Sequence, residues 1–302
     1  RTGPIAIRQE LDLLRPDTRG LPYVYGKLFS LDATENEAFI VERDAEIERV
    51  REHLLRSDGA SLLLVGDRGS GRTSVIRAAV SGARVQRKLV WLDADRPFSS
   101  AEQLLKWIGR AAGYEGSRAD HTAITAYLSQ ATPILVLDGI DQLVDRSQGG
   151  LEALGALTAL IGSTKDHIVW VATVETGIWH LLREVTSLTD LFTEIMALQP
   201  LSAEGLALAV RRRHRLSGQN VEFLPPSQSA LERIMSRLSG QDPEVAYWDW
   251  LAEQSRGNPR SALLVWMLSL VQRGEGGYDV VSGQSLITPG FELLPLRLAP
   301  VI

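Results

Sequence analysis

The sequence contains no cysteine. This absence excludes disulfide bonds, zinc sites built on thiolates and catalysis by a cysteine nucleophile. Long hydrophobic runs are also missing, because the longest apolar stretch, residues 262–271, is about half of the roughly 20 residues that a membrane-spanning helix needs. We therefore expect a soluble, cytoplasmic protein with no transmembrane segment.

Lysine is scarce, since only 4 of the 32 basic residues are lysine and the other 28 are arginine. The 37 acidic residues leave a net charge of −5, which argues against a protein that coats nucleic acid through bulk charge. Arginine and lysine are not equivalent where a site needs a compact ammonium group. The arginine-rich composition therefore bears on chemistry as well as on charge.

The length of 302 residues and the hydrophobic content of 44% predict about two domains with real cores. Five short runs rich in valine, isoleucine and leucine are separated by helix-length segments, and they lie at residues 61–65, 89–92, 134–137, 168–172 and 195–198. Buried runs of this kind are typical of a parallel sheet that is covered by helices on both faces. The sequence thus predicts an α/β domain at residues 37–200, preceded by an N-terminal arm at residues 1–36.

After Pro200 the strand signals stop, and helical patterns follow at residues 203–216, 227–238, 243–254 and 259–272. Ser202 is expected to cap the first of these helices, and Ser217-Gly218 is expected to end it. The glycine-rich residues 273–290 are expected to form a loop. We therefore predict a small all-helical domain at residues 201–273 and a C-terminal loop and tail at residues 274–302.

A glycine-rich motif lies between the first predicted strand and a helical run. It matches G-x-x-x-x-G-K-[ST] at every position except the lysine, which is replaced by arginine. Glycines let backbone N–H groups curl around an anion, and the helix that follows presents its positive N-terminus to the same phosphates. The motif predicts a phosphate-binding loop formed by Gly66, Asp67, Arg68, Gly69, Ser70, Gly71, Arg72, Thr73 and Ser74.

Arg72 is open to two interpretations. A planar guanidinium does not reproduce a point-charge ammonium between the β- and γ-phosphates, so ATP is expected to bind while its hydrolysis is slow. Alternatively, an arginine-rich sequence has acquired the residue without any functional consequence.

A second motif is the apolar run that ends in Asp138-Gly-Ile-Asp141. A carboxylate at this strand end holds magnesium opposite the loop hydroxyl in P-loop enzymes, so we expect Thr73 and Asp138 to form the magnesium site. Asp141 is the nearest candidate to orient an attacking water. The alternative is that Asp141 merely caps a helix that starts at Gln142.

Together these motifs resemble the AAA+ ATPases over about residues 37–273, and within them the origin-recognition-type and the signal-transducing STAND/NACHT-like branches. The resemblance implies a three-layer P-loop core with a five-stranded parallel sheet and a helical lid. It implies bound ATP or ADP with Mg²⁺. It also assigns roles to single residues: Thr173 as the first sensor, Arg260 as the second sensor, Arg183 as an arginine finger, and Ile40 and Val41 around adenine. Glu42 departs from the family pattern, which has glycine there.

The densest basic cluster is the run from Arg211 to Arg215, in which these two arginines share a helix face. A solvated face is one interpretation, and phosphate binding to nucleic acid is another. We expect a nucleotide-dependent conformational or assembly switch that self-associates or binds a protein partner. The alternatives are a DNA-binding initiator or loader ATPase, and a catalytically silent nucleotide-binding scaffold.

Overall fold

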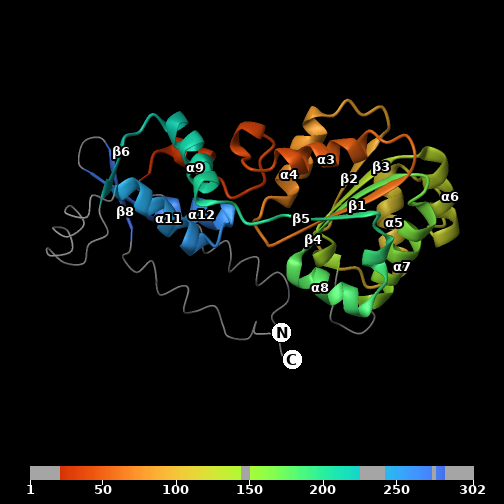
Figure 1. Cartoon of the computed structure of the whole chain (residues 1–302). Helices are drawn as coiled ribbons and strands as arrows, with labels where there is room; N and C mark the ends of the chain where they lie inside the picture. The colour runs from red at the N-terminus through yellow and green to blue at the C-terminus, as the bar shows by residue number, and fades with distance from the viewer. Residues whose placement is uncertain (1–20, 144–149, 225–241, 274–276, 283–302) are drawn as a thin grey trace. The chain divides into compact units, whose positions relative to one another are not determined.

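The computed structural model describes residues 21–143, 150–224, 242–273 and 277–282 (Figure 1). The chain divides into two compact units. The first unit is Ala33–Pro200, and the second joins Leu201 onward to the residues up to Asp32. None of the helices in the described ranges combines the length and the apolar character needed to cross a bilayer.

A five-stranded parallel sheet forms the centre of the first unit, as predicted. Its order is β2-β3-β4-β1-β5, so the first strand lies between the fourth and the fifth. The strands are β1 (Ala60–Gly66), β2 (Leu89–Asp93), β3 (Ile134–Asp138), β4 (Val169–Glu175) and β5 (Glu194–Ala197). This order brings the carboxyl ends of β1, β3 and β4 together at one edge of the sheet, where the predicted loop and acidic residues lie.

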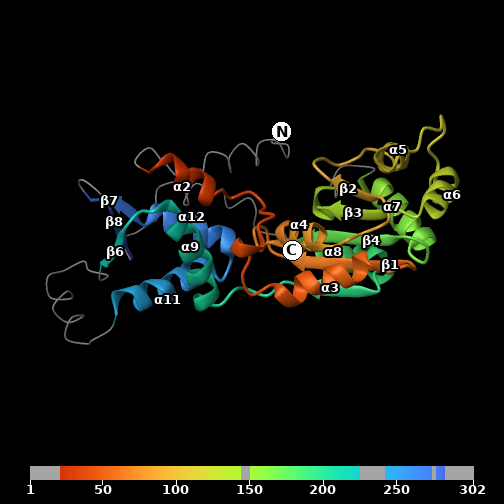
Figure 2. The same ribbon diagram turned by 90° about the horizontal axis from the view of Figure 1, so that it is seen from above.

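Helices cover both faces of this sheet (Figure 2). Leu62 and Leu64 of β1 pack in one core with α3 and α4, whereas Leu63 and Val65 pack in the core on the opposite face. The period of two along a fully buried strand accounts for both cores. The helices of this unit are α3 (Asp44–Leu54), α4 (Arg72–Gly82), α5 (Ala101–Ala112), α6 (His121–Ala131), α7 (Gly150–Thr164) and α8 (Thr176–Val185), with short 3-10 turns η1 (Glu37–Phe39), η2 (Ile140–Leu143) and η3 (Leu188–Leu191).

The second unit is mainly helical, with α2 (Tyr23–Leu28), α9 (Ala203–Ser217), α11 (Pro243–Ser255) and α12 (Pro259–Leu268). The hydroxyl of Ser202 accepts from the Gly205 N–H and caps α9, and Gly218 ends that helix in a left-handed conformation. Both helix ends confirm the prediction. The helix α2 contacts α9 and buries Tyr25 completely, so this N-terminal segment folds with the second unit.

Three short strands in the second unit correct the expectation of a domain built from helices alone. They are β6 (Val221–Leu224), β7 (Leu270–Gln272) and β8 (Tyr278–Val281), in the order β6-β8-β7. The helix that was expected to reach residue 272 ends at Leu268, and β8 lies inside the expected loop. Strand β6 pairs with β8, which lies far along the chain, and β7 and β8 are only 3 and 4 residues long, so local patterns do not reveal these strands. The helix expected at residues 227–238 lies outside the described residues.

Candidate nucleotide-binding site

The glycine-rich loop connects the end of β1 to the start of α4, as the motif predicts. Gly69 and Gly71 have φ angles of 86° and 101°, a left-handed conformation that side chains with a Cβ rarely adopt. A Cβ on Gly66 would lie 2.6 Å from the Ser70 hydroxyl and 3.3 Å from Leu198. The loop therefore needs glycine for conformation at Gly69 and Gly71 and for space at Gly66.

The loop encloses a hydroxyl that lacks a partner. Ser70 Oγ is buried and has no hydrogen-bond partner among the described residues, while Asp67 and Arg68 are exposed. A buried, unpaired hydroxyl costs free energy unless a ligand or water satisfies it. The loop thus fits an anion with several acceptor oxygens, such as a phosphate group. Ser74 lies in α4, and its hydroxyl accepts from the Thr34 N–H at 3.1 Å.

Asp138 lies at the centre of a group of hydrogen bonds at the carboxyl edge of the sheet. Its Oδ1 accepts from the Thr73 hydroxyl at 3.2 Å and from the Thr173 hydroxyl at 2.7 Å. Thr173 Oγ1 in turn accepts from the Gly139 N–H at 2.8 Å. Hydroxyl and carboxylate oxygens are the ligands that a hard cation prefers, so Thr73 and Asp138 fit a magnesium ion. Water and phosphate oxygens would complete the coordination shell of such an ion.

Asp141 lies in η2 beside this group and accepts three hydrogen bonds. Its donors are Arg72 Nη1 at 3.3 Å, the Glu175 N–H at 3.1 Å and Gln142 Nε2 at 2.9 Å. The Arg72 and Asp141 side chains are 12% and 13% exposed, so the pair is largely shielded from water. Arg72 therefore contacts the carboxylate that was expected to orient water.

Glu175 is a residue of this site that the sequence analysis missed. Its N–H holds Asp141, and its side chain accepts from the Ile178 N–H and caps α8. A carboxylate that directly follows a buried strand and precedes a helix is a signal that could have indicated it.

The segment expected around adenine is anchored next to the end of β5. Val41 is buried and Ile40 packs against the core beneath α3 and α4. Arg43 is buried and donates to the Gln199 carbonyl. The neighbouring Leu198 N–H donates to the Val65 carbonyl near the end of β1. Glu42 has a φ of 52°, so the backbone keeps the left-handed conformation that glycine would adopt there.

Comparison with known proteins assigns the family. The profile of the family described as Novel STAND NTPase 1 matches residues 25–241, which is more than half of the chain. The chain belongs to this STAND NTPase family. A search of curated proteins found no match.

Solved structures share the fold of this STAND NTPase. The Aeropyrum pernix ORC1 protein, solved in complex with DNA, is 20% identical over 85% of this chain and 62% of its own, with a TM-score of 0.50. The Aeropyrum pernix ORC2 protein, solved as ADPNP–ADP complexes, is 14% identical over 80% and 66%, with a TM-score of 0.51. The chain therefore spans less than two thirds of the length of these proteins. The likeness confirms the predicted AAA+ P-loop fold.

The remaining predicted site residues of the STAND NTPase lie outside the hydrogen-bonded group around Asp138 and Asp141. Arg183 is exposed on α8, and its guanidinium lies 5.0 Å from the centre of the Trp179 ring. Arg260 is the second residue of α12, in the second unit. Arg211 pairs with Glu244 at 2.6 Å, whereas Arg215 is exposed on the same helix.

Proposed function

We propose that this STAND NTPase is a conformational or assembly switch that binds ATP or ADP with Mg²⁺ and hydrolyses ATP slowly. The observation that carries this proposal is the ion pair between Arg72 and Asp141 inside the phosphate loop site. Arg72 is the one position at which the loop departs from its motif, and Asp141 is the carboxylate proposed to orient water. The ion pair joins these two residues.

Different groups of the site bind the phosphates, the metal ion and the base. Backbone N–H groups from Gly66 to Thr73 and the Ser70 hydroxyl bind phosphate oxygens, and the positive N-terminus of α4 stabilises their charge. The Thr73 hydroxyl and the Asp138 carboxylate hold the Mg²⁺ ion, which neutralises charge on the phosphates when it is bound. Ile40 and Val41 contact the base. Thr173 fixes Asp138 through a 2.7 Å hydrogen bond and so links the end of β4 to the metal site.

Slow hydrolysis follows from what surrounds Asp141. A carboxylate that orients or deprotonates water needs a free lone pair directed at that water. Three donors, one of them the Arg72 guanidinium, occupy three of the about four acceptor positions of this carboxylate, so little of it is left to orient a water. A lysine in the same position would instead present a compact charge to the phosphates.

The output of the switch is a change in the second unit. Thr173 and Arg260 respond to the γ-phosphate, and loss of that phosphate changes the position of the helical lid. Arg183 acts across a contact with a second copy, so the chain self-associates or binds a protein partner in the cytoplasm according to its nucleotide state.

Calorimetry and a hydrolysis assay test this function. ATP and ADP are expected to bind in the presence of Mg²⁺, and Arg72→Lys is expected to raise the rate of phosphate release about tenfold or more. Arg110→Lys is the matched control, because Arg110 is an exposed arginine of α5 outside the loop, and its rate is expected to stay at the parent value.

Absence of binding at millimolar nucleotide would overturn the proposal. If Arg72→Lys hydrolyses ATP no faster than the parent, Arg72 is not the block. A parent that releases no phosphate while Arg72→Lys does would favour the catalytically silent scaffold. Mass measurement in ADP and in a non-hydrolysable ATP analogue tests the assembly step, since the oligomeric state is expected to differ between them.

A DNA-binding initiator is the second candidate function, favoured by the fold shared with the DNA-bound ORC1 protein and by the exposed Arg215. Against it, Arg211 is already neutralised by Glu244, which lowers the positive charge of this helix face. Binding to duplex DNA that weakens steeply with salt and is lost in Arg215→Gln would support the initiator. Salt-independent or undetectable binding would exclude it.

A further inference from the structure

The chain crosses between the two units at two places, after Asp32 and after Pro200. The proposed function assigns no role to the first crossing. The residues directly after it, 33–36, contact α4, the helix that begins at the phosphate loop. We call residues 33–36 the strap. Their position makes the strap a candidate for a connection between the nucleotide site and the second unit.

Two side chains of α4 bind the strap. The Thr34 N–H donates to Ser74 Oγ at 3.1 Å, and Arg77 Nη1 donates to the Ala33 carbonyl at 3.3 Å. Arg77 Nη1 also lies 3.9 Å from Glu35 Oε1. Ser74 and Arg77 are three residues apart, so they lie on one face of the helix. The strap is therefore docked on the first half of α4 by one backbone N–H, one carbonyl and one ion pair.

Ser74 also belongs to the part of α4 that faces the expected phosphates. It is the third residue of the helix and directly follows Thr73. The N–H groups of a first helical turn have no partner within the helix and are free to bind an anion. The Ser74 side chain is only half-buried, and a hydroxyl that accepts one hydrogen bond still has its own hydrogen to donate. Ser74 is therefore able to bind a phosphate oxygen and the strap at the same time.

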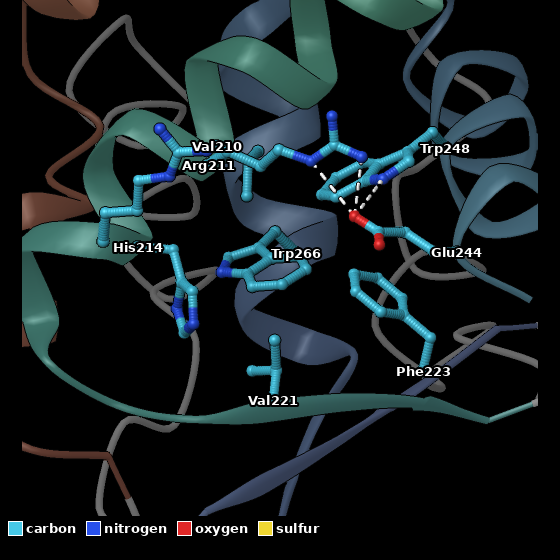
Figure 3. Close-up of a pocket in the computed structure, with 9 residues that line it drawn as sticks. Val210, Arg211, His214, Val221, Phe223, Glu244, Trp248 and Trp266 are labelled. Atoms are coloured by element: carbon cyan, nitrogen blue, oxygen red, sulfur yellow. Dashed lines mark hydrogen bonds and ion pairs between the residues drawn. The ribbon is translucent and has the colours of Figure 1, made fainter.

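The chain before the strap is fixed in the aromatic core of the second unit. Phe29 is 1% exposed, and its ring stacks on Tyr25 at 4.9 Å and on Trp266 at 6.4 Å between ring centres. Trp266 lies beside His214 (Figure 3), which is bonded to the Tyr25 hydroxyl. Only three residues separate Phe29 from Ala33. A connector this short leaves little slack, so a change in the docking of the strap reaches this aromatic core.

We propose that Ser74 is a positioning residue that couples nucleotide binding to the docking of the strap, and through the strap to α2 in the second unit. This inference rests on the proposed nucleotide binding and adds a connection that the lid movement uses. A bound phosphate satisfies the first-turn N–H groups, so the start of α4 opens less often and Ser74 stays in place as the acceptor for Thr34. By linkage, nucleotide binding and strap docking strengthen each other by the same factor.

Hydrogen–deuterium exchange of the full chain tests the coupling at the strap. Overlapping peptides across residues 30–38 are compared by mass spectrometry without nucleotide and with saturating ADP and Mg²⁺, the saturation being set by calorimetry. ADP is expected to slow exchange of the strap amides about fivefold. Ser74→Ala removes the acceptor, so its strap is expected to exchange at the same rate with and without ADP. Ser74→Thr keeps the hydroxyl and is expected to keep the ADP effect.

Ser81→Ala is the matched control for Ser74→Ala, because Ser81 is an exposed serine near the other end of α4, and the ADP effect is expected to stay at the parent value. The reciprocal effect is measured by calorimetry. Arg77→Gln loosens the strap one turn away from the phosphate loop and is expected to weaken ADP binding by up to about fivefold. Arg84→Gln removes the same charge from an exposed position after α4 and is expected to leave ADP affinity unchanged.

Equal strap exchange with and without ADP, in a parent that binds ADP by calorimetry, would overturn this inference and leave the proposed function standing. An ADP effect that persists in Ser74→Ala would overturn the role of Ser74. Absence of ADP binding at millimolar concentration would instead overturn the proposed function, and this inference with it. If Arg77→Gln fails to fold, the comparison of Ser74→Ala, Ser74→Thr and Ser81→Ala still decides the question.

Discussion

Replacing Thr173 by valine tests whether the hydrogen bonds at the carboxyl edge of the sheet stabilise the site. Valine has almost the same shape, and Thr173 is 1% exposed, so packing is preserved while the hydroxyl is lost. The change removes a 2.7 Å hydrogen bond to the Asp138 carboxylate and leaves the Gly139 N–H without its acceptor. A bond to a charged group contributes roughly 1.5–3 kcal/mol and a buried unpaired N–H costs about 1–3 kcal/mol, so we expect a loss of about 3 kcal/mol.

Urea unfolding followed by far-UV circular dichroism measures this loss as a lower midpoint at unchanged slope. Thr158→Val is the matched control, because the Thr158 hydroxyl bonds only the Leu154 carbonyl of its own helix, and its removal is expected to cost less than about 1 kcal/mol. If Thr173→Val is no more destabilising than Thr158→Val, the hydroxyl does not fix Asp138 and the reasoning is refuted.

Two further predictions concern stability. Arg49 and, more weakly, His53 lower the pKa of Glu194, so the stability this carboxylate gives is fully present above its ordinary pKa and is lost as the pH falls through the lowered value. Glu194→Gln is therefore expected to lower the free energy of unfolding at pH 7 by less than about 1 kcal/mol and to leave it unchanged in strong acid. A loss of stability that persists in acid would contradict this. Glu42 has a φ of 52°, a left-handed conformation that glycine adopts without strain. In thermal unfolding, Glu42→Gly is therefore expected to be more stable than Glu42→Ala by about 1 kcal/mol. Equal stabilities would show that the left-handed backbone is not strained.

The sequence predicts the first unit well because its signals are local and strong. The five apolar runs coincide with the five strands of the sheet, and the glycine motif gives the loop between β1 and α4. The second unit is predicted less completely, since β7 has only 3 residues and pairs with β8, which starts at Tyr278. Residues 270–272 continue an apolar helical pattern, and only the pairing with β8 directs them into a strand.

The site shows the same division between local pattern and tertiary arrangement. Parallel strand ends meet at one edge, which makes the meeting of Thr73, Asp138 and Thr173 predictable in principle from their positions. The contact of Arg72 with Asp141 depends on a side-chain rotamer and on the path of η2, and no spacing in the sequence encodes either. Glu42 is predictable in part. The glycine of the family pattern indicates a left-handed backbone at this position, and the structure shows that the backbone keeps this conformation with glutamate there.

The hydrogen bonds around Asp141 also determine how a changed hydrolysis rate in an Arg72 variant is interpreted. An arginine-rich composition explains how an arginine comes to replace a lysine, but it does not predict an ion pair at the point where hydrolysis would be controlled. Asp141 is held independently by the Glu175 N–H and by Gln142 Nε2, so removing the guanidinium leaves the carboxylate in place. A change in hydrolysis rate in Arg72→Lys therefore reflects the charge that reaches Asp141 and the phosphates, rather than a displaced loop, and compositional drift alone predicts no change in that rate.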